Sequence, residues 1–133
     1  KNIVIGAANC LKKGTKKAVL STGTIGNNVI AALNECSNTS EIAHYDFSFI
    51  KPLDYNVLQE IFNTYETIFT IEDGTINGGF GSAILEFAAA NNFTNSVKIL
   101  GIPDTFIEHG TVLELQQLCK IDVKNLTKLF SNH

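Results

Sequence analysis

The stretch 69–85 constrains the fold most, because it passes from strand-forming residues through two acids and clustered glycines into a helix-forming segment. Residues 68–71 are β-branched or aromatic, which favours a strand. The glycines that follow permit backbone angles closed to other residues; they are Gly74, Gly78, Gly79 and Gly81. The segment 83–90 is rich in helix formers, and Ser82 is its predicted N-cap. The stretch therefore predicts a strand, a tight turn and a helix in succession.

Such a strand, turn and helix could hold an anion, since the free N–H groups and the dipole of a helix start both favour negative charge. A dinucleotide-binding fingerprint would need a third glycine at position 84, which is Ile84, and no Lys-Ser or Lys-Thr pair follows the glycines as a phosphate-binding loop requires. We favour a structural role, in which the glycines only make the turn and let the helix pack closely on the sheet.

Strand-like and helix-like segments also alternate in the rest of the chain. Further strands are predicted at 17–21, 42–47 and 97–101, with a short edge strand at 2–5. Further helices are predicted at 28–35, 56–62, 112–118 and from Asp122 to Phe130. Thr111 and Glu114 have the spacing of a capping box. This alternation predicts a mostly parallel α/β sandwich.

Composition limits the function classes. The chain has 133 residues, 44% of them hydrophobic, which suits a single domain over residues 1–133. A net charge of −3 argues against nucleic-acid binding, and no run approaches the ~20 apolar residues of a membrane helix. Three widely spaced cysteines favour reduced thiols and a cytoplasmic location. The absence of methionine, with Lys1 first, predicts a piece of a longer chain.

The loops after successive parallel strands gather along one sheet edge, where ligands of α/β proteins usually lie. Polar residues expected there are Thr22, Thr24, Asp46, Glu72, Asp73, Asp104 and His109. They could form a polar site or a subunit contact, and both interpretations stay open. His44 and Asp46 share a strand face, and we expect them to point towards water.

The remaining ionisable groups form no complete catalytic set. Glu72 and Asp73 are neighbours, so capping or solvated charge is favoured over an acid/base pair. Glu108 and His109 lie in a loop bounded by proline and glycine, which suits an interface or a structural loop equally. No hydrolase or metal-site motif is present, so no catalytic, cofactor-binding or metal residue is assigned. The candidate interface or anion-site residues are Glu72, Asp73, Gly78, Gly79, Gly81, Ser82, Asp104, Glu108 and His109.

Five segments of the chain contain recognisable motifs, namely 19–24, 46–54, 72–74, 78–82 and 102–110. Together these segments resemble the C-terminal domain of the transketolase-like thiamine diphosphate enzymes, and among them the 1-deoxy-D-xylulose-5-phosphate synthases. Residues 46–54 resemble the motif Asp-x-Arg-Phe-x-Lys-Pro-Leu-Asp, with Ser48 in place of its arginine. The Lys-Pro-Leu-Asp part is shared with transketolases and with beta subunits of 2-oxo acid dehydrogenases. The Gly-Gly-Phe-Gly-Ser and Pro-Asp-x-Phe-Ile-Glu-His-Gly segments are similar to those of the synthases.

The resemblance implies a three-layer α/β/α sandwich with a five-stranded, mostly parallel mixed sheet. It also implies a homodimeric parent enzyme that condenses pyruvate with glyceraldehyde 3-phosphate, releases carbon dioxide and supplies isoprenoid, thiamine and pyridoxal synthesis. Thiamine diphosphate and Mg²⁺ would be bound by other domains, and this domain would support assembly without chemistry of its own. The alternatives are a separate subunit or domain of another transketolase or 2-oxo acid dehydrogenase type of enzyme, or an anion-binding module.

Overall fold

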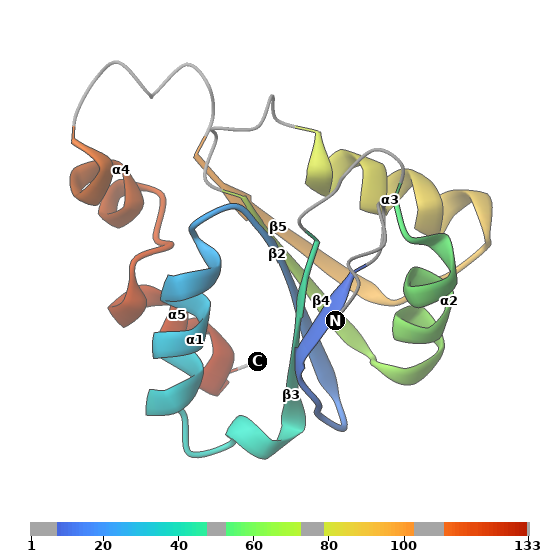
Figure 1. The fold of residues 1–133 in the computed structure, drawn as a ribbon, viewed down its shortest axis with the longest axis horizontal. Coiled ribbons are helices and arrows are strands. Elements are labelled where there is room, and N and C mark those ends of the chain that lie inside the picture. Colours follow the sequence, from blue (N-terminus) through green and yellow to red (C-terminus); the bar gives the residue numbers. More distant parts are fainter. Residues whose placement is uncertain (1–7, 48–52, 73–78, 103–110, 133) are drawn as a thin grey trace.

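The computed structural model describes residues 8–47, 53–72, 79–102 and 111–132, which form a five-stranded sheet between two layers of helices. Figure 1 shows α1, α4 and α5 on one side of the sheet and α2 and α3 on the other. This arrangement confirms the predicted three-layer α/β/α sandwich. Both faces of the sheet are therefore covered, as is usual for parallel strands.

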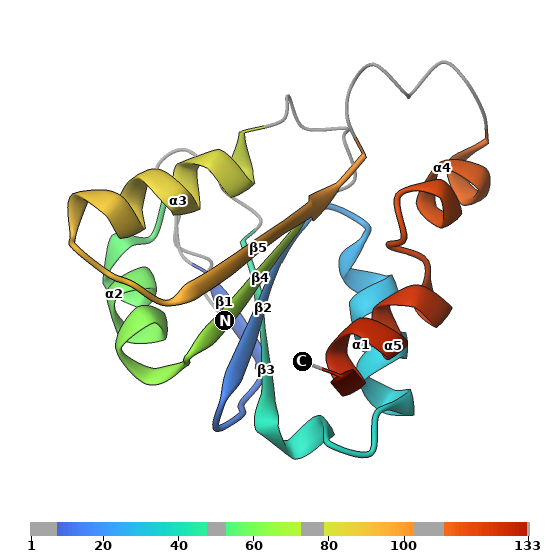
Figure 2. The same cartoon turned by 180° about the vertical axis from the view of Figure 1, so that it is seen from behind.

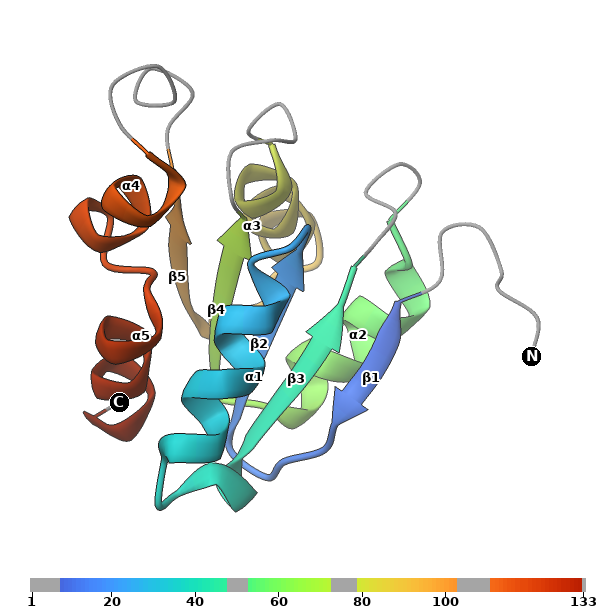
Figure 3. The ribbon, with the colours of Figure 1, turned by 60° about the vertical axis from the view of Figure 1, so that its left-hand side comes forward.

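The sheet has the order β1-β3-β2-β4-β5, which Figure 3 shows across the face of the molecule. The strands are β1 (Asn9–Lys12), β2 (Lys17–Thr22), β3 (Ile42–Asp46), β4 (Thr67–Glu72) and β5 (Ser96–Gly101). The last four run parallel, while β1 pairs antiparallel with β3 at the edge. An edge strand was expected at 2–5, which lies outside the described residues; the observed edge strand is β1.

The helices lie close to their predicted positions. They are α1 (Gly26–Glu35), α2 (Tyr55–Thr64), α3 (Phe80–Ala90), α4 (Val112–Leu118) and α5 (Val123–Asn132), with a short 3₁₀ helix, η1 (Thr39–Glu41). The predicted capping box of α4 is confirmed, because Thr111 Oγ1 accepts the Glu114 N–H and Glu114 Oε1 accepts the Thr111 N–H. The prediction of Ser82 as an N-cap is wrong. α3 begins at Phe80 with Gly79 as its N-cap, which leaves Ser82 exposed inside the first turn.

Two hydrophobic clusters fill the space between the sheet and its helical layers. Alternation along each strand sends neighbours to opposite clusters, as with Leu20 on the α2 and α3 side and Val19 on the α1 and α5 side. The ring of Phe130 in α5 packs edge-on against that of Phe69 in β4, with centroids 5.4 Å apart. Burying such a ring stabilises the fold by roughly 2–3 kcal/mol, so Phe130 anchors the last helix to the sheet.

The end of the chain is also tied to α1 by polar contacts, and Figure 2 shows α1 and α5 side by side. The side-chain amide of Asn28 donates to the Ile121 carbonyl, and that of Asn38 donates to the Phe130 carbonyl. Asp122 immediately precedes α5, and its main-chain carbonyl accepts the Leu126 N–H. These contacts hold α5 over the sheet face that α1 covers.

Candidate functional site

The carboxyl ends of the parallel strands bring polar residues to one edge of the sheet, as the sequence predicted. Asp46 and Glu72 end β3 and β4, and Thr22 ends β2 between them. The register pairs Ser21 with Asp46 and Thr22 with Glu72, so these groups lie on adjacent strands. Of the other residues expected at this edge, Thr24 lies in the turn after β2. Asp73, Asp104 and His109 lie outside the described residues.

On the α1 side of this edge, Ser21 and His44 form a buried polar pair. Ser21 Oγ lies 2.7 Å from His44 Nε2, and the His44 side chain is only 1% exposed. Desolvation lowers the pKa of His44 to about 4, although the nearby Asp46 charge acts in the opposite direction. The imidazole is therefore neutral at pH 7. The expectation that His44 points towards water is wrong, because α1 begins directly over Ser21 on this sheet face.

On the α3 side, the carboxylate of Glu72 lies at the start of the helix. Its Oε1 accepts the Gly81 N–H at 3.4 Å, an arrangement that suits the positive end of the helix dipole. Its Oε2 is buried and has no hydrogen-bond partner among the described residues, and the same is true of the hydroxyls of Thr22 and Thr70. A side chain at Gly81 would place its Cβ 2.6 Å from Ile99 Cγ2, so the glycine permits this close approach.

These contacts bear on whether the described part of the glycine-rich stretch could bind an anion. Glu72, Gly79 and Gly81 meet at the start of α3, whereas Ser82 is exposed. An added anion at this point would approach the Glu72 carboxylate, which is unfavourable. The remaining predicted candidates, Asp73, Gly78, Asp104, Glu108 and His109, lie outside the described residues. The interface and anion-site assignments stay predictions.

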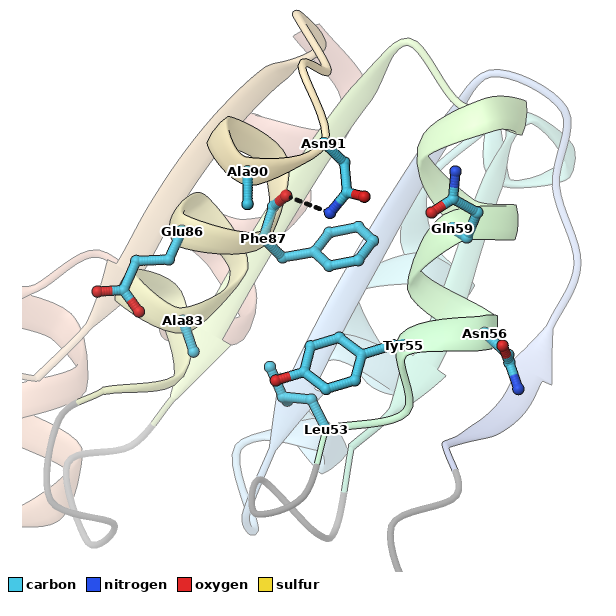
Figure 4. Close-up of a pocket in the computed structure, with 9 residues that line it drawn as sticks. All are labelled: Leu53, Tyr55, Asn56, Gln59, Ala83, Glu86, Phe87, Ala90 and Asn91. Carbon is cyan, nitrogen blue, oxygen red and sulfur yellow. Dashed lines mark hydrogen bonds between the residues drawn. The ribbon is translucent and has the colours of Figure 1, made fainter.

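A groove that the sequence did not predict lies between α2 and α3. It has a volume of about 490 Å³, and its lining residues are Leu53, Tyr55, Asn56, Gln59, Ala83, Glu86, Phe87, Ala90 and Asn91. Figure 4 shows the rings of Tyr55 and Phe87 facing each other between the two helices. Their centroids are 5.9 Å apart with an interplanar angle of 23°, and Tyr55 is 58% exposed. No motif marks these residues, because the groove arises from the packing of two helices distant in sequence.

Metal-binding and membrane-spanning features are absent from the part of the chain that the structure describes. Within these ranges no group of three or more His, Cys, Asp or Glu residues could hold a metal ion. Cys10, Cys36 and Cys119 are free thiols. None of the described helices has the length and apolar character needed to cross a membrane. The expectation that thiamine diphosphate and Mg²⁺ bind to other domains stays a prediction.

Comparison with known proteins places the chain in a family. A family model described as the transketolase C-terminal domain matches residues 6–126. The chain belongs to the transketolase C-terminal domain family. The matched residues include the whole sheet and the groove. The last helix, α5, begins within the match and extends beyond it.

Curated relatives of this transketolase C-terminal domain carry the name 1-deoxy-D-xylulose-5-phosphate synthase. The protein from Bacteroides thetaiotaomicron is 51% identical over 128 residues, and that from Parabacteroides distasonis is 50% identical over 125 residues. The alignments cover 95% and 93% of this chain but only 20% of each relative. The chain therefore spans about a fifth of the length of these relatives.

A solved structure has the same fold. It is described as a split gene transketolase, an inactive beta4 tetramer, and superposes with a TM-score of 0.79 at 22% sequence identity. The match covers 96% of this chain and 42% of that chain. At this identity the likeness shows the fold alone, and it agrees with the five-stranded mixed sheet described above.

Proposed function

We propose that this chain is the C-terminal assembly domain of a 1-deoxy-D-xylulose-5-phosphate synthase. The observation that carries the proposal is the 51% identity to a protein of that name over nearly the whole chain. The parent enzyme would condense pyruvate with glyceraldehyde 3-phosphate and release carbon dioxide. Its product would enter isoprenoid, thiamine and pyridoxal synthesis in the cytoplasm.

The geometry of the described residues favours a structural role within that enzyme. The His44 imidazole is hydrogen-bonded and buried, and the Glu72 carboxylate accepts a hydrogen bond from the Gly81 N–H at the start of α3. Neither group lines the groove between α2 and α3 or the cleft between α1 and α5. Thiamine diphosphate and Mg²⁺ would be held by the domains that make up the other four fifths of the relatives. Residues 1–133 would form one domain that packs against those domains and a second protomer.

The decisive experiment compares the parent enzyme with a version that lacks this domain. We expect the intact enzyme to be a homodimer by light scattering and the truncated enzyme to dissociate or aggregate. A truncated enzyme that stays dimeric with an unchanged kcat would overturn the assembly role. The isolated 133-residue chain, supplied with thiamine diphosphate and Mg²⁺, should neither bind the cofactor in a calorimetric titration nor decarboxylate pyruvate.

The same experiment addresses the alternative of a separate subunit. A split enzyme would require this chain to bind a second polypeptide without a covalent link. Mixing the purified chain with the truncated enzyme would then restore the full assembly at stoichiometric concentrations. Restoration only by the covalently joined domain favours the single-chain arrangement that we propose.

A further inference from the structure

The groove between α2 and α3 is an exposed surface, whereas most other aromatic side chains of the described residues are enclosed. Tyr55 leaves 58% of its surface exposed even though its ring stacks on Phe87. On the α3 side of the groove, Ala83 and Ala90 contribute only short methyl side chains (Figure 4). An exposed aromatic ring in a concave surface is typical of a binding anchor.

A hydrogen bond fixes the start of the described chain next to this groove. The Ala8 N–H donates to Asp54 Oδ2 at 3.1 Å, while Asp54 Oδ1 accepts the Val57 N–H and caps α2. Asp54 lies between Leu53 and Tyr55, which both line the groove. The polypeptide therefore enters the sheet at the same end of α2 where the groove begins.

The charges of the lining residues indicate the chemistry of the occupant. Glu86 is the charged residue of the lining set, and none of that set is basic. Asn56, Gln59 and Asn91 contribute side-chain amides, of which the Asn91 amide already donates to the Phe87 carbonyl. A lysine or arginine would place its aliphatic stem on the Tyr55 ring and its cationic head beside Glu86.

We infer that this groove binds a segment of the parent enzyme that precedes this domain in the same protomer and presents a lysine or arginine side chain. The inference rests on the proposed function, because it requires the additional length seen in the relatives. Ala8 is hydrogen-bonded to Asp54, whose neighbours Leu53 and Tyr55 line the groove, so the start of the described chain lies at the groove end of α2. The groove thus fixes how the domain sits on the rest of its own chain.

Photo-crosslinking in the full-length parent enzyme tests the inference. Tyr55 is replaced by p-benzoylphenylalanine, and the matched control carries the same group at Leu113. Leu113 is 60% exposed but lies on α4, in the opposite helical layer. We expect position 55 to crosslink to a peptide upstream of this domain in the same protomer, and position 113 not to reach that peptide. Crosslinks only within residues 1–133, crosslinks to a second protomer, or no crosslink from position 55 would each overturn the inference.

Charge reversal tests the chemistry of the occupant. Glu86→Lys should reduce the yield of the upstream crosslink at least threefold, because it opposes the incoming cation. Glu60→Lys makes the same charge change on the exposed surface of α2 outside the lining set and should leave the yield unchanged. Equal yields in both variants would overturn the cationic occupant.

The two proposals fail in different ways. If removal of the domain breaks the dimer but position 55 does not crosslink upstream, the assembly role stands and the groove assignment fails. If position 55 crosslinks upstream but the truncated enzyme stays dimeric, the groove assignment stands and the assembly role fails.

Discussion

Ser21 Oγ and His44 Nε2 lie 2.7 Å apart beneath the start of α1, where both side chains are almost fully buried. Gly26, the first residue of α1, makes this possible, since a Cβ there would come within 3.2 Å of Ser21 Oγ. The pair is enclosed between β2, β3 and the helix. Its polar groups satisfy each other, which is the condition for burying them without a large free-energy cost.

The buried imidazole should make the stability of the chain depend on pH. The pKa of His44 is about 4 when folded and about 6.5 when unfolded, so the unfolded state binds more protons between these values. The contribution of His44 to the free energy of unfolding should therefore be constant above pH 7 and fall by up to about 3 kcal/mol as the pH drops from 6.5 to 4. Urea denaturation across this range measures the effect.

The matched variant is His44→Gln, which keeps a hydrogen-bonding group near Ser21 but does not titrate. It should be less stable than the wild type at pH 7 and should lose much less of its stability between pH 6.5 and 4. Parallel pH profiles for the two proteins would show that His44 is not the group responsible.

Two glycines should respond differently to replacement by alanine. At Gly14 a Cβ would lie 2.4 Å from the Ala43 main-chain nitrogen, so only the backbone of β3 could move. At Gly81 the closest atom is Cγ2 of Ile99, a half-exposed side chain on the edge strand. Gly81→Ala should cost about 1–3 kcal/mol, and Gly14→Ala should cost more. Thermal denaturation of both variants gives the comparison.

A second substitution separates the two mechanisms. Ile99→Ala removes the clashing methyl group, so the Gly81→Ala and Ile99→Ala double variant should recover part of the lost stability. The same change cannot help Gly14→Ala, because Ile99 is not near that site. Strictly additive losses in the Gly81 pair would argue against the steric contact with Ile99 as the cause.

The sequence predicted the four parallel strands because each is a short β-rich run that precedes a helical segment with its own periodicity, whereas the edge strand β1 was not predicted at its observed position. The order of β4 followed by α3 was also predicted correctly, although the predicted N-cap of α3 was wrong. Ser82 has the residue type of an N-cap, but Glu72 already provides a carboxylate at the helix start from nine residues earlier in the chain. Local sequence rules do not include such distant acceptors.

His44 shows the corresponding limit for burial. Its alternation with Asp46 predicted a solvated face, but that face of β3 is covered by α1. The buried His44 imidazole is instead hydrogen-bonded to Ser21 from the neighbouring strand. The α2 and α3 groove was missed for a related reason. Tyr55 and Phe87 are distant in sequence, and only the packing of their helices brings the rings together. Contacts between elements decided both outcomes.

The capping box of α4 should determine whether this short helix persists. Thr111→Ala removes the acceptor for the Glu114 N–H, and such a loss typically costs about 1 kcal/mol. We expect faster amide hydrogen exchange in α4 with little change in β2 or β4. Thr111→Ser keeps the hydroxyl and serves as the control. Equal protection of α4 in both variants would contradict a stabilising role for the cap.

Glu72 offers the sharpest distinction between an assembly domain and a substrate-binding one. In the full enzyme, Glu72→Ala leaves the Gly81 N–H without its acceptor at the start of α3, which should lower stability by about 1 kcal/mol. Assembly should weaken, while the Michaelis constants stay within twofold of those of the wild type.

Glu66→Ala is the control, because Glu66 is exposed just before β4 begins. His109→Ala should behave like Glu72→Ala, although His109 lies outside the described residues. A Glu72→Ala enzyme that stays fully dimeric but shows a selectively raised Michaelis constant would contradict the assembly role of this carboxylate.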